Sequence, residues 1–168
     1  MAPKAVIVGP PGSGKSTIGK RLARALDLPF FDTDAAVEVE TGRTIAQIFV
    51  EDGEPAFRAI EERIVRKAVE SSEGIVSLGG GSILSERTRA LLKGHTVIYL
   101  EISVAEGLKR TRGNTVRPLL ADGDPRQKYT ELLRVRGTLY EEVSSIRIRT
   151  DGRSPSRVVK NLVSKLTE

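Results

Sequence analysis

The sequence GPPGSGKST at residues 9–17 fits the pattern G-x-x-x-x-G-K-[ST], which is typical of a loop that binds phosphate groups. Backbone N–H groups turn inward around an anion in such a loop, and glycine permits this because it adopts positive φ without steric cost. We predict that Lys15 reaches the β- and γ-phosphates of a nucleotide and that the Ser16 hydroxyl binds Mg²⁺. The alternative is a structural turn that matches the pattern by chance.

The segments on either side of residues 9–17 favour phosphate binding. Residues 5–8, AVIV, form a short run suited to a buried parallel strand. Apolar residues then recur at helical spacing after the loop, at Ile18, Leu22, Ala25 and Leu26. Strand, loop and helix therefore follow in the order that the motif needs, with the N-terminus of the helix directed at the phosphates.

The composition is that of one soluble globular domain spanning residues 1–168. Hydrophobic residues make up 39% and charged residues 29% of the 168, and there is no cysteine, which excludes disulfides. No apolar stretch approaches the roughly twenty residues of a membrane span, so we expect a cytoplasmic protein without a membrane partner. The net charge of +5 suits a small anionic substrate. Nucleic acid is the alternative, but the basic residues are dispersed and aromatic residues are few.

Strand-like and helix-like segments alternate along the chain. Strands are predicted at residues 5–8, 29–32, 74–78, 96–100 and 145–150. Helices are predicted after the phosphate-binding loop and at residues 45–51, 54–70, 85–92, 105–111, 127–143 and 157–167. This alternation predicts an α/β fold, a three-layer αβα sandwich around a five-stranded parallel sheet. Ligands bind at the carboxyl ends of such strands, where Gly9, Asp32, Gly79 and Glu101 fall.

Two carboxylates, Asp32 and Asp34, follow the second predicted strand. In extended backbone they would face the same side, roughly 6–7 Å apart. Asp32 beside Ser16 is a candidate Mg²⁺ ligand acting through water, because Mg²⁺ prefers hard oxygen ligands and keeps several waters. Asp34 is a candidate to orient an attacking hydroxyl or to accept its proton. The alternative is that the pair caps the N-terminus of a helix.

Three arginines, Arg58, Arg117 and Arg136, are candidates to hold anionic groups, because a guanidinium grips carboxylates and phosphates with two parallel hydrogen bonds. Each is also compatible with an ordinary surface arginine. Arg58 and Glu61 stand at helical spacing, so they are equally compatible with a structural ion pair. Residues 112–125 carry glycines and prolines with little periodicity and are predicted to form a loop.

Together, these motifs resemble the shikimate kinase family, in particular its actinobacterial members. The resemblance runs from end to end and rests on PPGSGKST at 10–17, DTD at 32–34, FR at 57–58, GGG at 79–81, RPLL at 117–120 and Arg136. It implies a P-loop fold of the nucleoside-monophosphate-kinase type with sheet order 2-3-1-4-5. It also implies transfer of the γ-phosphoryl of ATP to the 3-hydroxyl of shikimate, which gives shikimate 3-phosphate and ADP in chorismate and aromatic amino-acid biosynthesis.

The resemblance assigns roles to individual residues. It implies a shikimate-binding region at about residues 33–61, a lid at about residues 112–124 and Mg²⁺ as the cofactor of ATP. We also expect a monomer. Shikimate is expected to be held by Asp34, Arg58, Gly80, Gly81 and Arg136. ATP is expected to be held by Gly12, Ser13, Gly14, Lys15, Ser16, Thr17, Arg110, Arg117, Arg153 and Pro155. The expected catalytic residues are Lys15, Asp34 and Arg117, and the expected metal ligands are Ser16 and Asp32.

Two residues depart from the family pattern: Thr138 stands where proline is frequent, and Arg112 stands where relatives often have glycine. One competing interpretation is another small-molecule kinase of the same fold, acting on gluconate or a nucleotide. The arrangement of Arg58, the three glycines and Arg136 argues against it. The other is a P-loop switch or a nucleic-acid-associated ATPase. The chain lacks the N-K-x-D sequence of a switch that reads guanine, and no predicted strand ends in Asp-Glu as in a motor ATPase.

Overall fold

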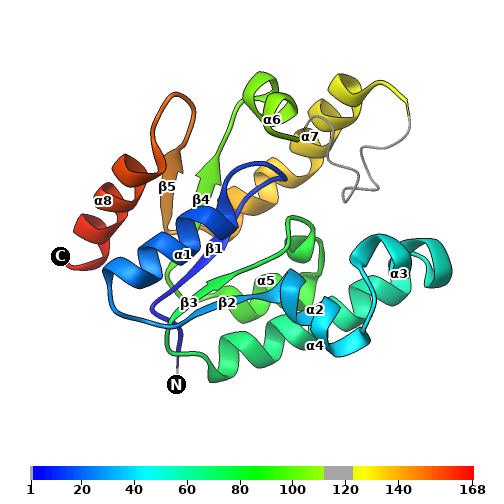
Figure 1. Ribbon diagram of the computed structural model, residues 1–168, viewed down its shortest axis with the longest axis horizontal. Helices are drawn as coiled ribbons and strands as arrows, with labels where there is room; N and C mark the ends of the chain where they lie inside the picture. The colour runs from blue at the N-terminus through cyan, green and yellow to red at the C-terminus, as the bar shows by residue number, and fades with distance from the viewer. Residues whose placement is uncertain (1, 112–122) are drawn as a thin grey trace.

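The computed structural model describes residues 2–111 and 123–168, which are built around a five-stranded parallel sheet (Figure 1). The strands are β1 (Ala5–Val8), β2 (Phe30–Asp32), β3 (Ile75–Ser77), β4 (Val97–Glu101) and β5 (Ile146–Arg149). They lie in the order β2-β3-β1-β4-β5, and every neighbouring pair is parallel. The predicted fold class and the sheet order implied by the resemblance are confirmed.

Helices connect the strands at each crossover. Those in the described residues are α1 (Lys15–Ala25), α2 (Thr33–Thr41), α3 (Ile45–Asp52), α4 (Glu54–Ser71), α5 (Glu86–Leu92), α6 (Val104–Thr111), α7 (Pro125–Val143) and α8 (Pro155–Leu166), with a 3-10 turn, η1 (Ser82–Leu84). The predicted helices are all present, with ends that shift by one or two residues. Helix α2 and turn η1 are the two elements that the sequence-based expectation lacks.

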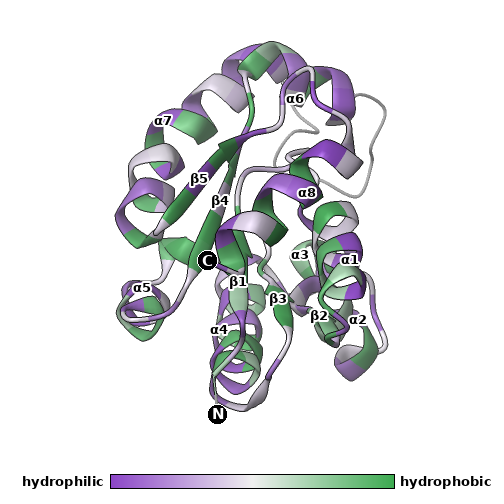
Figure 2. Cartoon of the chain, turned by 90° about the vertical axis from the view of Figure 1, so that its left-hand side faces the viewer, coloured by the Kyte–Doolittle hydropathy of each residue, from purple (hydrophilic) through white to green (hydrophobic). Residues whose placement is uncertain are grey.

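The central strand β1 divides the apolar residues between two cores. Ala5 and Ile7 pack in one cluster with residues of α1 and α8, whereas Val6 and Val8 pack in another with residues of α4, α5 and α7. Successive side chains of a strand point to opposite faces, so this alternation places one helical layer on each side of the sheet. Figure 2 shows the strands mostly in the green of apolar residues between the two helical layers.

A smaller apolar cluster joins α2, α3 and α4 beside the sheet, and its buried members are Val37, Ile48, Phe57 and Ile64. Helix α3 begins at a capping box, in which the Gln47 N–H donates to Thr44 Oγ1 at 3.1 Å and the Thr44 N–H donates to Gln47 Oε1 at 2.8 Å. Residues 33–61 thus form an ordered helical unit next to the end of β2.

The carboxyl ends of four strands meet at one edge of the sheet. Gly9 follows β1, Asp32 ends β2, Gly79 comes two residues after β3, and Glu101 ends β4. The expected convergence of these positions is confirmed, because the strands are parallel and adjacent. In the part of the chain that is described, no helix has the length and apolar character to span a membrane.

Candidate active site

The loop between β1 and α1 surrounds the side chain of Lys15. Gly12 and Gly14 have φ of 84° and 94°, in the left-handed region that favours glycine. The buried Lys15 Nζ donates to the carbonyl oxygens of Gly9 at 2.8 Å and Pro10 at 3.1 Å. Gly14 precedes α1 and has no side chain with which to cap it, so the first N–H groups of the helix are left for an anion. The structure therefore has the features of a phosphate-binding loop.

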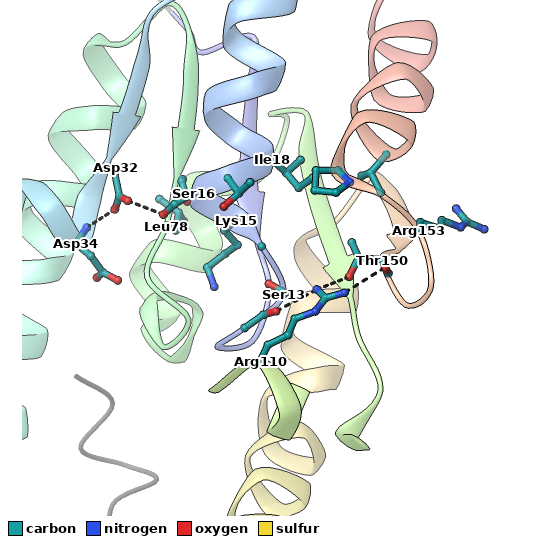
Figure 3. Close-up of a pocket in the computed structure, with 16 residues that line it drawn as sticks. Ser13, Lys15, Ser16, Ile18, Asp32, Asp34, Leu78, Arg110, Thr150 and Arg153 are labelled. Carbon is teal, nitrogen blue, oxygen red and sulfur yellow. Dashed lines mark hydrogen bonds between the residues drawn. The ribbon is translucent and has the colours of Figure 1, made fainter. Parts of the chain in front are cut away.

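A pocket of about 500 Å³ opens beside this loop (Figure 3). Residues 12–17 line one side of it, and Arg110, Thr150, Arg153 and Pro155 are also in its wall. Arg110 Nη1 donates to the carbonyl of Gly12 at 3.2 Å and to Thr150 Oγ1 at 3.3 Å, which ties the loop to the segment after β5. The described residues that the resemblance assigns to ATP all line this one pocket.

Residues 33–34 are not extended as expected, because α2 begins at Thr33, directly after the extended Asp32. Asp32 is the N-cap of this helix: its Oδ1 accepts from the N–H groups of Asp34 at 2.9 Å and Ala35 at 3.4 Å. Asp34 lies in the first turn. The expected same-side pair of carboxylates on a strand is therefore wrong, and the capping interpretation is confirmed for Asp32. Figure 3 shows Asp34 and Lys15 pointing toward the same open part of the pocket.

The second oxygen of Asp32 faces the phosphate-binding loop. Ser16 Oγ donates to Asp32 Oδ2 at 2.8 Å, so a hydroxyl and a carboxylate oxygen lie together in the wall of the pocket. These are hard oxygen ligands of the kind that Mg²⁺ prefers. Within residues 2–111 and 123–168, no group of three or more His, Asp or Glu side chains could hold a metal. The pair thus fits a Mg²⁺ ion that takes its remaining ligands from phosphates and water.

Gly79 leaves room for two carboxylates. A Cβ atom built on Gly79 would lie 2.5 Å from Asp34 Oδ1 and 2.8 Å from Glu61 Oε2, closer than real Cβ contacts allow. Glu61 is 3% exposed although it is charged. Asp34 from α2 and Glu61 from α4 thus converge on the loop after β3.

The next two glycines face the expected acceptor-binding arginines. A Cβ on Gly81 would lie 2.5 Å from Arg58 Nη1, and one on Gly80 would lie 3.6 Å from Arg136 Nη1. None of residues 79–81 has positive φ, so at Gly79 and Gly81 glycine provides space and not unusual backbone geometry, whereas a Cβ on Gly80 would make ordinary contacts. The structure brings Asp34, Arg58 and Arg136 together around a three-residue segment, as expected for one acceptor site.

Arg58 is held by two carboxylates of its own helix. Its Nε donates to Glu54 Oε2 at 3.2 Å and its Nη1 to Glu61 Oε1 at 2.8 Å. Burial of the guanidinium disfavours its charge, but Glu61 and Glu54 outweigh this effect and raise the pKa of Arg58 above its ordinary value. The guanidinium carbon also lies 5.1 Å from the centre of the Phe57 ring. The ion pair considered as an alternative is present, and it also fixes the guanidinium beside Gly81.

Sequence reasoning missed two buried tyrosines of α7. Tyr129 Oη donates to the carbonyl of Pro11 at 2.7 Å, and Tyr140 Oη donates to the carbonyl of Gly80 at 2.5 Å. Both residues are 0% exposed. Helical periodicity places them on the buried face of α7, but it does not indicate which backbone groups their hydroxyls bind.

Two residues noted in the sequence analysis, Arg117 and Arg112, lie outside the described residues, as does most of the expected lid. The remaining departure from the family pattern, Thr138, lies inside α7. The position therefore continues a helix in this chain.

Comparison with known proteins gives consistent matches. The family model described as shikimate kinase matches residues 11–167. The chain is 81% identical over 168 residues to a shikimate kinase of Rhodococcus jostii, with all of both chains covered. The solved structure of shikimate kinase from Acinetobacter baumannii in complex with shikimate has a TM-score of 0.95 at 34% identity, covering 99% of this chain and 94% of that one.

A gluconokinase structure from Sinorhizobium meliloti also matches, and it bears on the rival interpretation. It has a TM-score of 0.57 at 22% identity, covering 99% of this chain and 92% of that one. At this identity the match shows a shared fold alone.

Proposed function

Because the chain belongs to the shikimate kinase family, we propose that its P-loop pocket binds ATP and that the residues around Gly79–Gly81 bind shikimate. The enzyme transfers the γ-phosphoryl group of ATP to the 3-hydroxyl of shikimate. The main support for an ATP site and a shikimate site that adjoin each other is the position of Asp34. This residue lines the P-loop pocket and also lies against Gly79.

The ATP half of the site works by placing positive charge around the transferring group. The Lys15 ammonium lies within the loop, 2.8 Å from the carbonyl of Gly9, and the N-terminus of α1 adds its backbone N–H groups and its dipole. The N-terminus of α1 is formed before the nucleotide binds, so its N–H groups and dipole need little reorganisation as charge moves toward the bridging oxygen. Arg110, Arg153 and Pro155 lie across the pocket, where the base of ATP is proposed to bind.

The acceptor half of the site combines two guanidinium groups with exposed backbone. Arg58 and Arg136 are proposed to grip the carboxylate of shikimate, and Gly80 and Gly81 to approach its ring closely because they have no side chains. Asp34 is proposed to orient the 3-hydroxyl and to accept its proton as the oxygen attacks phosphorus. Since the transition state is loose, most of the catalytic effect of Asp34 is positioning of that hydroxyl.

Ser16 and Asp32 are proposed to hold Mg²⁺, which supplies neutralising charge to the β- and γ-phosphates when it binds with ATP. Their mutual hydrogen bond of 2.8 Å keeps the two oxygens together at the edge of the pocket. The N-cap bonds of Asp32 fix the orientation of its carboxylate.

Arg117 is proposed to close over ATP and to stabilise the developing charge, as part of a lid at about residues 112–124. The chain is proposed to act as a single domain over residues 1–168. It is also proposed to be a monomer and to work in the cytoplasm.

Release of ADP with different acceptors tests the proposed function. With ATP and Mg²⁺, we expect shikimate to stimulate ADP release strongly, whereas gluconate, nucleoside monophosphates and a polynucleotide leave the basal rate unchanged. In the same assay, Lys15→Ala should lower kcat by about a hundredfold or more, because it removes a positive charge from the phosphate-binding loop. Stimulation by one of the other acceptors, or full turnover by the Lys15 variant, would contradict the proposal.

A further inference from the structure

Helix α7 presents an unusual buried face to the site. Its buried residues are Tyr129, Leu132, Arg136 and Tyr140. Their spacing of three, four and four residues places all of them on one side of a helix. Three of these four side chains carry polar groups, which are costly to bury unless they have partners. The partners found for the two tyrosine hydroxyls lie in the two loops that make up the site.

Tyr140 serves the acceptor half of the site. Its Oη donates to the carbonyl of Gly80 at 2.5 Å, and its ring packs against the Tyr99 ring, with the ring centres 5.1 Å apart and the planes tilted by 35°. Burial raises the pKa of Tyr140, and the nearby charge and hydrogen bond of Arg136 partly offset that rise. The hydroxyl therefore bonds the backbone of the glycine loop at Gly80, the residue that the Arg136 guanidinium also faces.

Tyr129 serves the ATP half of the site. Its Oη donates to the carbonyl of Pro11, inside the phosphate-binding loop, at 2.7 Å. Its ring lies against Gly107 in α6: a Cβ on that glycine would be 2.6 Å from Tyr129 Cε1. Glycine is unfavourable inside a helix, so its presence in α6 is explained by the room that the Tyr129 ring needs.

We propose that Tyr129 and Tyr140 are positioning residues, of which Tyr129 fixes the phosphate-binding loop for ATP and Tyr140 fixes the glycine loop and Arg136 for shikimate. The proposal rests on the proposed function of the two half-sites. Both hydrogen bonds are buried, so water is a poor replacement for either hydroxyl. Removal of a hydroxyl therefore leaves the loop carbonyl without its donor and frees the loop to move.

The two effects are separable because the tyrosines stand eleven residues apart, which is about 16 Å along a helix. They also bind loops that follow different strands, β1 for Pro11 and β3 for Gly80. A general loss of packing in α7 would weaken both substrates together. Loss of a single hydroxyl is expected to weaken the substrate of one loop only.

Steady-state kinetics of three Phe variants test the proposal. We expect Tyr140→Phe to raise the KM for shikimate about three- to tenfold and to leave the KM for ATP within a factor of about two. Tyr129→Phe is expected to raise the KM for ATP by the same factor and to leave the KM for shikimate within a factor of about two. Tyr99→Phe is the matched control, since it removes the same atom from a ring that packs on Tyr140, and no described residue exchanges a hydrogen bond with the Tyr99 hydroxyl. It should change neither KM.

The outcomes distinguish this proposal from the proposed function. If wild-type enzyme does not turn over shikimate, the proposed function fails, and the affinity for ATP alone, measured by calorimetric titration, still decides the role of Tyr129. If wild-type enzyme is active but the variants raise both KM values equally, or lower only the melting temperature, the positioning role is overturned. For Tyr140, combination with Arg136→Lys should give an increase in the KM for shikimate smaller than the product of the single effects, because both side chains lie at Gly80 and are proposed to act on the same substrate group. Strict multiplicativity would show that Tyr140 does not position Arg136.

Discussion

The two oxygens of the Asp32 carboxylate accept hydrogen bonds from two different helices. Oδ1 accepts from the N–H of Asp34 in the first turn of α2, and Oδ2 accepts from the Ser16 hydroxyl of α1. The first contact stabilises the helix, since an N-cap is typically worth about 1 kcal/mol. The second holds a proposed metal ligand in place. At this position structural and functional roles do not compete, because the carboxylate has an oxygen for each.

The first glycine after β3, Gly79, leaves a space that a methyl group would fill. In Gly79→Ala the new Cβ would meet the carboxylates of Asp34 and Glu61, and neither can withdraw freely, because Asp34 sits in the first turn of α2 and Glu61 is bonded to Arg58. We expect kcat/KM for shikimate to fall at least about tenfold, which corresponds to about 1.4 kcal/mol.

Steady-state kinetics with varied shikimate measure this effect, and Gly137→Ala is the control, because a Cβ there has nothing within 4 Å. Equal kcat/KM for the Gly79 variant and wild-type enzyme would show that the loop does not need glycine for space.

Helix α7 contains a glycine that lowers its stability. Gly137 lies in the interior of this helix in open space, so Gly137→Ala should increase the free energy of unfolding by about 0.5–1 kcal/mol. Urea unfolding at pH 7 measures this difference. A decrease in stability would mean that the glycine has a packing role that its surroundings do not show.

Elements with a strong apolar period were predictable from sequence, and those defined by caps were not. Strand β1 and helix α4 bury continuous or periodic apolar residues, which the sequence displays. Helix α2 buries only Thr33 and Val37, so it has almost no periodic signal. Its limits depend on the Asp32 cap and on Gly42, whose φ of 68° ends the helix, and such geometry is not visible in the spacing of apolar residues.

At the scale of the whole molecule, one edge of the sheet gathers segments that are far apart in the chain. The phosphate-binding loop was predictable because its chemistry lies in nine consecutive residues. The acceptor side required the resemblance as well, since Arg58 and Arg136 are separated by 78 positions and only the fold brings them to the glycine loop. The hydroxyl contacts of Tyr129 and Tyr140 were not predictable, because a buried tyrosine reads in sequence as an ordinary core residue.

Two separately formed half-sites are proposed to meet at Asp34, which orients the acceptor and does not hold ATP. The most direct measurement is the turnover of Asp34→Asn at saturating shikimate, together with calorimetric titration of the same variant with ATP and Mg²⁺. The amide keeps the shape of the carboxylate but cannot accept the proton, so we predict that kcat falls by about a hundredfold or more while ATP affinity is unchanged. Full turnover by Asp34→Asn at saturating shikimate would contradict the claim, as would loss of its ATP binding.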